Sequence, residues 1–213
     1  MKTRIIIVAS LVATIFAPGS CLGQNGSGVL QVTFDEPPTL RPGAGIHLQE
    51  YFEAGMWFGR MPGSDGFGRQ WTGDPRDPDN GTIAFLQATL GDTLSFGTND
   101  TAFGLFSVDL AEYSTVVPDP VTVRFVGYRH DGSIVTSEVT TDGIMDGTGP
   151  LTDFQTFFFG PEFSNLDRVE IPTSGWSLDN LVVLVPEPGT WALIMAGGLL
   201  FGARHFRKGD TAQ

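Results

Sequence analysis

The sequence predicts an all-β protein, an antiparallel β-sandwich whose topology best fits a jelly roll. Between residues 24 and 185, apolar residues recur with a period near two. β-branched and aromatic residues alternate there with clusters of Gly, Pro, Asp and Asn, and no long amphipathic helix stands out. Short strands with separated partners favour two packed sheets, and the absence of an internal repeat disfavours a solenoid or propeller.

The strands are read from this alternation. In 29–35, Leu30, Val32 and Phe34 face one side. The stretch VTVRFVGYRHDGSIVTSEVT predicts a hairpin, because Asp131-Gly132 can supply the positive φ angles of a tight turn. The predicted strands span residues 29–35, 82–89, 93–96, 103–110, 121–129, 133–140, 154–159, 166–171 and 178–185.

The N-terminus has the layout of a secretory signal peptide. Two basic residues precede the uncharged apolar run 5–17, and small residues follow it. We expect residues 1–23 to form the signal. Cleavage after Gly19 in place of Gly23, and lipidation of Cys21, are the alternatives. With at most one thiol retained, no intramolecular disulfide is expected.

The C-terminus carries a second apolar run, residues 191–203, which as a helix would span roughly 20 Å at ~1.5 Å per residue. This is shorter than the ~30 Å hydrocarbon core of a bilayer. The segment therefore predicts a transient membrane stop and a poor permanent anchor. A core helix of the globular domain is the alternative, but polar positions at helical spacing are absent from the run. The basic cluster beyond it consists of Arg204, Arg207 and Lys208.

These features resemble the PEP-CTERM sorting signal of exported bacterial proteins, a tail also called the ice-binding protein C-terminal domain, a label that implies no ice binding. The resemblance implies recognition by an exosortase-type enzyme, transient association with the inner membrane, and delivery to the cell surface or the exopolysaccharide matrix. It places the sorting signal at residues 186–213, after the last strand. Its motif is Val185, Pro186, Glu187 and Pro188.

The passenger between the two signals, residues 24–185, is long enough for one domain with one core. It holds 22 acidic residues and seven Arg without Lys, so its formal charge is 7 − 22 = −15. Such a surface has no basic stripe for phosphates, which excludes nucleic acid as a partner. It suits divalent cations, although solubility alone also explains it.

The stretch from 53 to 81 is rich in Gly and Pro and predicts a long loop, a feature that is usually either functional or mobile. Aromatic rings beside guanidinium and carboxylate groups fit a sugar platform, because a pyranose presents an apolar face and polar hydroxyls. The alternative is that the tryptophans plug one end of the sandwich. The candidate platform residues are Trp57, Trp71, Arg60 and Arg69.

Two places suggest calcium. The loop 74–81 offers alternate oxygen donors but lacks the EF-hand spacing, so a solvated acidic turn is the better explanation. The acidic residues after the first strand and in the final Trp176-to-Val183 stretch resemble jelly-roll carbohydrate-binding modules. That resemblance implies a structural Ca²⁺ held by Asp35 or Glu36 and Asp179, whereas Asp179-Asn180 as a simple turn is the alternative.

No motif selects an enzyme. The passenger has two histidines, His47 and His130, and lacks a nucleophile elbow, a zincin motif and a phosphate loop. We expect a non-enzymatic surface or matrix protein that binds polysaccharide. The alternative is a secreted polysaccharide hydrolase that uses Asp and Glu as acid and base, although no carboxylate pair is singled out. A structural matrix component without a ligand is a third interpretation.

Overall fold

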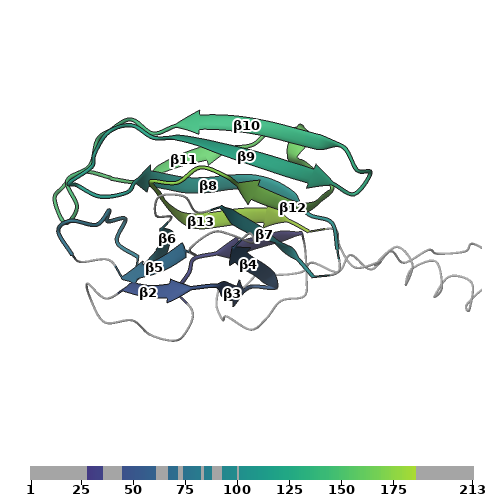
Figure 1. The fold of residues 1–213 in the computed structure, drawn as a ribbon, viewed down its shortest axis with the longest axis horizontal. Coiled ribbons are helices and arrows are strands. Elements are labelled where there is room, and N and C mark those ends of the chain that lie inside the picture. Colours follow the sequence, from purple (N-terminus) through teal and green to yellow (C-terminus); the bar gives the residue numbers. More distant parts are fainter. Residues whose placement is uncertain are drawn as a thin grey trace, which may run out of the picture.

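A computed structural model describes residues 28–35, 45–60, 67–71, 74–82, 84–87, 93–99 and 101–185. The predicted signal peptide and the segment after residue 185 lie outside these residues. The described chain forms two antiparallel sheets, which confirms the prediction of an all-β sandwich (Figure 1). The single helical element among these residues is one 3₁₀ turn, η1 (Pro161–Phe163).

The seven-stranded sheet consists of β1 (Val29–Val32), β2 (Gly45–Leu48), β5 (Phe67–Trp71), β6 (Ala84–Gln87), β8 (Gly104–Glu112), β11 (Gln155–Phe158) and β13 (Trp176–Leu184). Its order is β11-β8-β13-β6-β5-β2, with β1 also beside β13. Strand β8 pairs along one edge of β13. On the other edge, β6 meets Ser177 and Leu178, and β1 meets the last four residues of β13.

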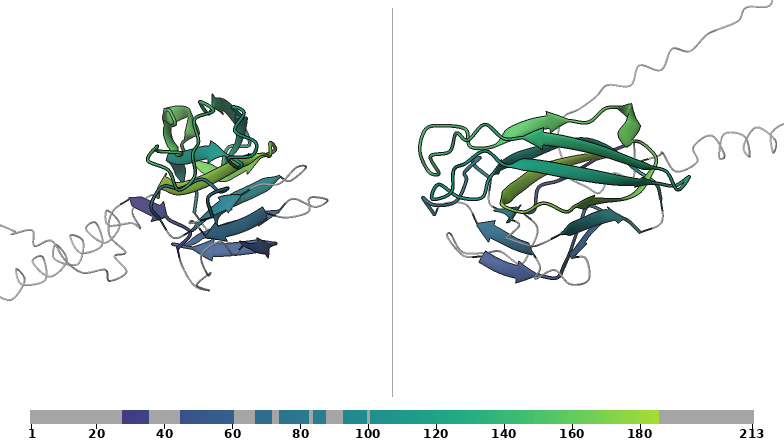
Figure 2. Two further views of the ribbon diagram at one scale, coloured as in Figure 1. Left: turned by 90° about the vertical axis from the view of Figure 1, so that its left-hand side faces the viewer. Right: turned by 45° about the horizontal axis from the view of Figure 1, so that its top comes forward.

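The six-stranded sheet consists of β3 (Glu50–Glu53), β4 (Met56–Arg60), β7 (Leu94–Thr98), β9 (Thr122–Arg129), β10 (Ile134–Thr140) and β12 (Leu166–Ile171). Its order is β10-β9-β12-β7-β4-β3. The chain changes sheet repeatedly from β7 to β13, so the two layers are interwoven in sequence (Figure 2).

All nine predicted strands are present, with ends that differ by a few residues. The prediction of a long loop over 53–81 is wrong, because this stretch contains β4 and β5. Glycine hid them. In MWFGR, Met56 and Phe58 alternate into the core while the glycine that follows allows close packing on the outer face.

The predicted hairpin is confirmed as β9 and β10, in register from Thr122↔Thr140 to Tyr128↔Ile134. Its turn differs in detail from the expectation. Gly132 alone has a positive φ, 82°. Asp131 acts through its side chain, whose Oδ1 accepts bonds from the Ser133 backbone N at 2.9 Å and hydroxyl at 2.6 Å.

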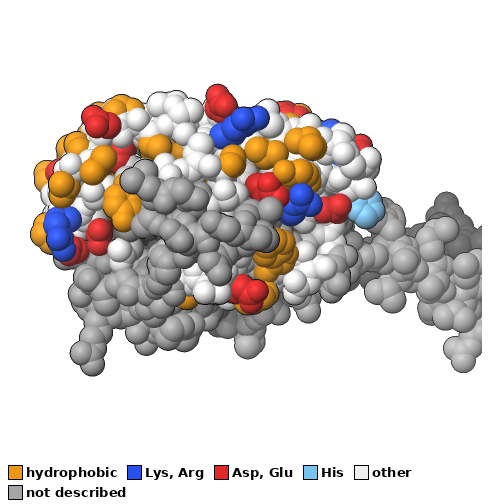
Figure 3. All heavy atoms as spheres, viewed as in Figure 1, with side chains coloured by type: hydrophobic (Ala, Val, Ile, Leu, Met, Phe, Trp, Pro, Cys, Tyr) orange, Lys and Arg blue, Asp and Glu red, His pale blue; other side chains and the backbone are white. Residues whose placement is uncertain are grey.

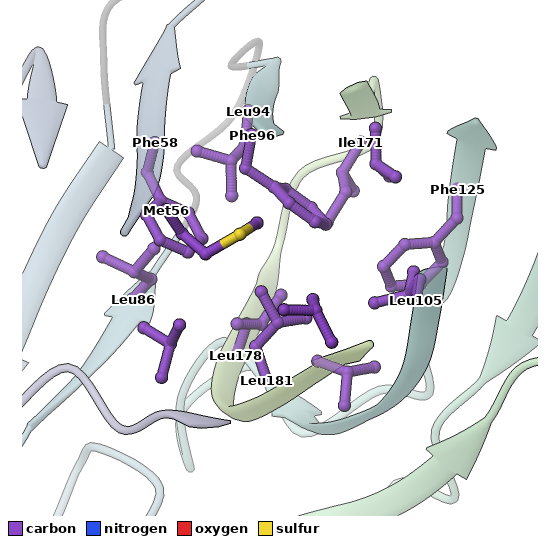
Figure 4. Packing of buried hydrophobic residues seen from close by; sticks show 14 of the residues in the cluster. Met56, Phe58, Leu86, Leu94, Phe96, Leu105, Phe125, Ile171, Leu178 and Leu181 are labelled. Atoms are coloured by element: carbon purple, nitrogen blue, oxygen red, sulfur yellow. The ribbon is translucent and has the colours of Figure 1, made fainter. Parts of the chain in front are cut away.

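The core lies between the sheets, where inward side chains of both layers meet (Figure 4). Phe58 of β4 stacks on Phe96 of β7 with ring centroids 5.5 Å apart, and Phe34 meets Phe58 edge-on at 5.2 Å. From the other sheet, Leu86, Leu178 and Leu181 are fully buried. Burying each such side chain contributes roughly 1.5–3 kcal/mol. Because these positions are fixed inward, their neighbours must face outward on the two outer faces.

Candidate functional site

The structure divides the four predicted platform residues between the sheets. Trp57 and Arg60 belong to β4, whereas Arg69 and Trp71 belong to β5 of the other sheet. The side chains of Arg60, Arg69 and Trp71 lie outside the described part of the chain. Trp57 is partly exposed and its neighbours on both sides are buried in the core, so it lies on the outer face of the six-stranded sheet.

Strand register aligns Trp57 with side chains from the other strands of this sheet. Phe52 pairs with Trp57, Trp57 with Gly97, Arg168 with Tyr128, and Tyr128 with Ile134. Continuing the β12–β7 register by one residue places Arg168 opposite Gly97. The row crosses all six strands, and from Phe52 to Tyr128 it covers roughly 19 Å at ~4.8 Å per strand. We call this set the aromatic row: Phe52, Trp57, Gly97, Arg168, Tyr128 and Ile134.

Two glycines let the indole of Trp57 lie down on the sheet. Its Cζ3 and Cε3 atoms are 3.5 and 3.6 Å from where a Cβ on Gly59 would stand. Its Nε1 is 3.2 Å from the corresponding position on Gly97 of the neighbouring strand. Opposite edges of the ring thus rest on two bare backbone positions. A side chain at either glycine would lift the ring, so the glycines determine its orientation.

Arg168, Tyr128 and Glu170 form a connected cluster in this row. The Arg168 guanidinium carbon lies 3.7 Å from the centroid of the Tyr128 ring. Glu170 accepts from Arg168 Nε at 2.9 Å and from the Tyr128 hydroxyl at 2.8 Å. The hydrogen bond to Glu170 raises the pKa of Tyr128, so the phenol stays protonated and donates. Each group holds another in place, which fixes a cation, a ring and a carboxylate side by side.

The chemistry of this face is mixed. Phe52 and Ile134 expose 60% and 61% of their surface at the two ends of the row. The face seen in Figure 3 carries hydrophobic side chains immediately beside Lys or Arg and Asp or Glu side chains. Flat apolar rings next to oriented hydrogen-bonding groups are the combination that ligands with one apolar and one polar side require.

A second cluster surrounds Asp179 of β13, which is fully buried. Its Oδ2 accepts from Asn80 Nδ2 and from Thr82 Oγ1, both at 2.7 Å, and its Oδ1 accepts from the Asn180 backbone N at 2.7 Å. Desolvation nevertheless dominates and raises the pKa of Asp179 from 3.8 to about 7. The charge of Asp35 raises this pKa further.

The position of Asp179 follows from the sheet. On one edge of β13 the partner changes from β6 to β1 at this point. The β8 register also shifts between Asp179 and Val182, and Asn180 has φ 45°. Phe34, which precedes Asp35, has φ 59°. A bulge and two left-handed residues therefore turn the chain where both carboxylates lie.

The three residues predicted to hold calcium are only partly placed. Asp35 and Asp179 lie within electrostatic reach of each other, whereas Glu36 is outside the described residues. In the described part of the chain, no group of three or more His, Cys, Asp or Glu side chains is arranged to hold a metal ion. The donors that face Asp179 belong to Asn80 and Thr82. Asn80 lies in the candidate loop 74–81, but the sequence did not connect that loop with Asp179.

The acidic loop 74–81 is tied to its own neighbours and to the loop before β11. Asp74 forms an ion pair with Arg76 at 2.9 Å, and the hydrogen bond from Arg76 lowers the pKa of Asp74 to about 2. Buried Asp153 accepts from the backbone N of Asp79 at 2.9 Å and from that of Asp146 at 2.8 Å. These carboxylates fix the loop conformation.

The two histidines of the passenger lie in different parts of the fold. His130 lies in the β9–β10 turn, where its Nδ1 is 2.9 Å from Asp167 Oδ1 in an exposed pair. The side chain of His47 on β2 lies outside the described part.

The sequence revealed Trp57 but not its companions. Phe52, Tyr128 and Arg168 were not singled out, although each alternates with a buried neighbour in its strand. Alternation could have assigned them to an outer face. Their alignment could not have been found this way, because it depends on which distant strands pair, β4 with β7 and β12 with β7 and β9.

Comparisons with known proteins address the tail and the fold separately. The PEP-CTERM protein-sorting motif matches residues 184–208. The match begins at the last residue of β13. No curated protein matches the sequence. Within the described ranges, the structure contains no helix of the length and apolarity that crossing a membrane requires.

Among solved structures, the chain is similar to a DUF4465 family protein from Bacteroides caccae. The identity is 14%, the TM-score is 0.50, and 74% of this chain and 100% of that chain are covered. It is also matched to a CBM29-2 carbohydrate-binding module mutant in complex with mannohexaose, at 11% identity and TM-score 0.35, covering 75% and 92%. The chain is therefore an exported β-sandwich protein that carries a PEP-CTERM sorting motif for an exosortase-type processing enzyme.

Proposed function

We propose that the sandwich binds polysaccharide along the aromatic row, without catalysis, after it is sorted to the cell surface or the extracellular matrix. The observation that carries this proposal is the indole of Trp57, which lies on Gly59 and Gly97 in line with Phe52 and the Arg168–Tyr128 pair. A ring in this position presents a flat apolar surface to the C–H face of a sugar. The row is long enough for several sugar units.

The polar members of the row can form hydrogen bonds with the hydroxyl groups of a sugar. Arg168 has more donors than its bond to Glu170 uses, and the Tyr128 hydroxyl oxygen can accept while it donates. Glu170 already accepts one bond on each oxygen. This carboxylate therefore orients its neighbours and is poorly suited to transfer protons, which favours binding over hydrolysis.

Retention of the full-length chain on insoluble glucan, mannan and xylan tests the proposal. Trp57→Ala should lower affinity by about two- to tenfold, because one aromatic stacking contact contributes roughly 0.5–1.5 kcal/mol. Trp57→Phe should keep part of the glycan affinity. Val116→Ser, which changes an exposed apolar residue in a distant loop, is the matched control. Equal retention of Trp57→Ala and wild type would reject this site, and release of reducing sugar would favour the hydrolase alternative.

Three further proposals accompany the main one. The repeated crossing of the chain between sheets from β7 to β13 favours jelly-roll topology. The electrostatic effect of Asp35 on Asp179 supports a structural Ca²⁺ held by Asp179 with Asp35 or Glu36. The sorting motif favours a transient stay in the inner membrane, followed by removal of the tail. Mass spectrometry of extracellular material should find chains that end near Val185, and an intact Met1-to-Gln213 chain would contradict this route.

A further inference from the structure

The seven-stranded sheet also exposes aromatic side chains on its outer face. Phe106 of β8 and Phe158 of β11 expose 43% and 70% of their surface. Their rings meet edge to face, with centroids 5.7 Å apart and planes at 79°. Leu184 and Val29, paired across β13 and β1, expose 43% and 60%. We call these four residues the phenylalanine strip. Exposed apolar side chains gathered in this way indicate a contact surface.

A chain of hydrogen-bonded polar side chains crosses the same four strands. Thr156 Oγ1 of β11 donates to Asp109 Oδ1 of β8 at 2.6 Å, and Asn180 Nδ2 of β13 donates to Asp109 Oδ2 at 2.9 Å. Gln31 Nε2 of β1 then donates to Asn180 Oδ1 at 3.1 Å. We call Thr156, Asp109, Asn180 and Gln31 the polar ladder. All four remain at least partly exposed, so the ladder is open to a ligand and held in one arrangement.

The strip and the ladder lie side by side. Thr156 and Phe158 are two positions apart on β11, and Gln31 and Val29 are two positions apart on β1. Residues two apart on a strand face the same side at roughly 6.6 Å. The face thus offers one apolar row and one row of hydroxyl, carboxylate and amide groups, which are the two kinds of contact that a sugar chain makes with a protein.

The charge of this face limits the ligand. Strands β1, β8, β11 and β13 contain no Lys or Arg, and the ladder itself carries the Asp109 carboxylate. An anionic glycan would meet repulsion there without a compensating cation. A neutral polysaccharide can donate hydroxyl hydrogens to Asp109 and exchange bonds with the amides of Asn180 and Gln31.

We propose that the phenylalanine strip and the polar ladder form a second glycan site, specific for neutral polysaccharide, on the side of the sandwich opposite the aromatic row. The class of ligand rests on the proposed function, whereas the site rests on its own residues. Packed sheets lie about 10 Å apart and the sites face away from each other. One glycan chain therefore occupies one site, and a single domain bridges two chains.

The test compares binding with bridging for the full-length chain and soluble neutral glucan or mannan. Wild type should bind two oligosaccharides per chain by calorimetry and cross-link the polymer, seen as turbidity. Phe106→Ser with Phe158→Ser should bind one oligosaccharide and abolish turbidity, and its avidity for a dense glycan surface should fall about a hundredfold. Trp57→Ala should also abolish turbidity. Gln31→Ala, a milder change at an exposed position, should weaken the same site, and matched unfolding midpoints show that the variants remain folded.

The outcomes separate the two proposals. In one outcome, the wild-type chain binds one oligosaccharide, with binding lost in Trp57→Ala and kept in the phenylalanine variant. That result overturns the second site and leaves the proposed function standing. If glycan binding is lost in the phenylalanine variant but not in Trp57→Ala, the result supports the second site and rejects the aromatic row. A dimer in solution that the phenylalanine variant converts to monomer assigns this face to self-association and overturns the inference.

Discussion

The two outer faces of the sandwich differ in how they hold their polar groups. On the six-stranded sheet, Arg168, Tyr128 and Glu170 contact one another next to exposed rings, with Arg168 at the surface. On the seven-stranded sheet, the Asp109 ladder is open, whereas Asp179, its register partner, is fully buried beneath Asn80 and Thr82. One face has a cation and no deeply buried carboxylate in its row. The other has a buried carboxylate and no Lys or Arg in β1, β8, β11 and β13.

This difference teaches that strand alternation alone does not fix the environment of an outward side chain. Asp109 and Asp179 are opposite each other in the β8–β13 register, yet a loop covers only the second. The break between β6 and β1 along β13 creates the place that the loop fills. The buried carboxylate should therefore control stability, and the exposed cluster should control recognition.

The largest expected effect is a loss of stability with rising pH. The folded pKa of Asp179, about 7, exceeds its ordinary value of 3.8. The folded state therefore keeps a proton that the unfolded state releases. Stability from this group is complete below about pH 4 and is lost as pH rises to 7 and above, by up to about 4 kcal/mol. Denaturant unfolding at pH 5 and pH 8 measures it, and Asp179→Asn should remove the dependence.

Asp74 offers a control of opposite sign at a partly exposed site. Its pKa is lowered by Arg76, so its contribution is present above its ordinary pKa and is lost only in acid. Asp74→Asn should leave the difference in stability between pH 5 and pH 8 intact.

If Ca²⁺ binds between Asp35 and Asp179, millimolar calcium should restore stability at pH 8 and have no effect on Asp179→Asn. A wild-type stability that rises from pH 5 to pH 8 would contradict the assignment.

A smaller effect is expected from a single methyl group on the six-stranded face. In Gly97→Ala the Cβ would stand 2.7 Å from the Asp167 carbonyl oxygen and 3.2 Å from Trp57 Nε1. We expect a loss of about 1–3 kcal/mol in unfolding free energy, together with weaker glycan retention, because the indole must move. Thermal unfolding and the glycan assay measure the two effects.

Gly104→Ala is the matched control on the other sheet. Its Cβ would meet neighbours at 3.6 Å or more, an ordinary contact distance. It should leave stability nearly unchanged. Equal stability of the two alanine variants would show that the orientation of the Trp57 indole does not depend on the absence of a side chain at Gly97.

The same comparison shows what the sequence could predict. Alternation with buried Met56 and Phe58 was visible, and it places Trp57 outward. The sequence does not show that Gly97, forty residues later, lies under the ring, because contact between β4 and β7 depends on sheet order. Likewise, Asp179 was recognised as a candidate ligand. Its partners Asn80 and Thr82 were not, because they come from a loop about a hundred residues away.

A further prediction separates the faces by ligand charge. Arg168 is the cation of the aromatic row, whereas the strands around the polar ladder contain none. A polyuronate should therefore bind to the six-stranded face alone. Arg168→Gln should weaken polyuronate retention several-fold at low salt and change retention of neutral glucan less. Equal loss for both polymers would mean that Arg168 acts through hydrogen bonding and not through its charge.

The smallest effect concerns the stability that the exposed cluster itself provides. Arg168 has a side chain 42% exposed, so its cation–π contact with Tyr128 and its bond to Glu170 are screened by water. We expect Arg168→Ala and Glu170→Gln each to cost about 0.5–1 kcal/mol of unfolding free energy. A double-mutant cycle between them should give a coupling below about 1 kcal/mol, because the Arg168 side chain remains in contact with water although that of Glu170 is only 12% exposed. A coupling several times larger would show that the cluster is a stability element like Asp179. The contrast between a recognition face and a stability-controlling one would then fail.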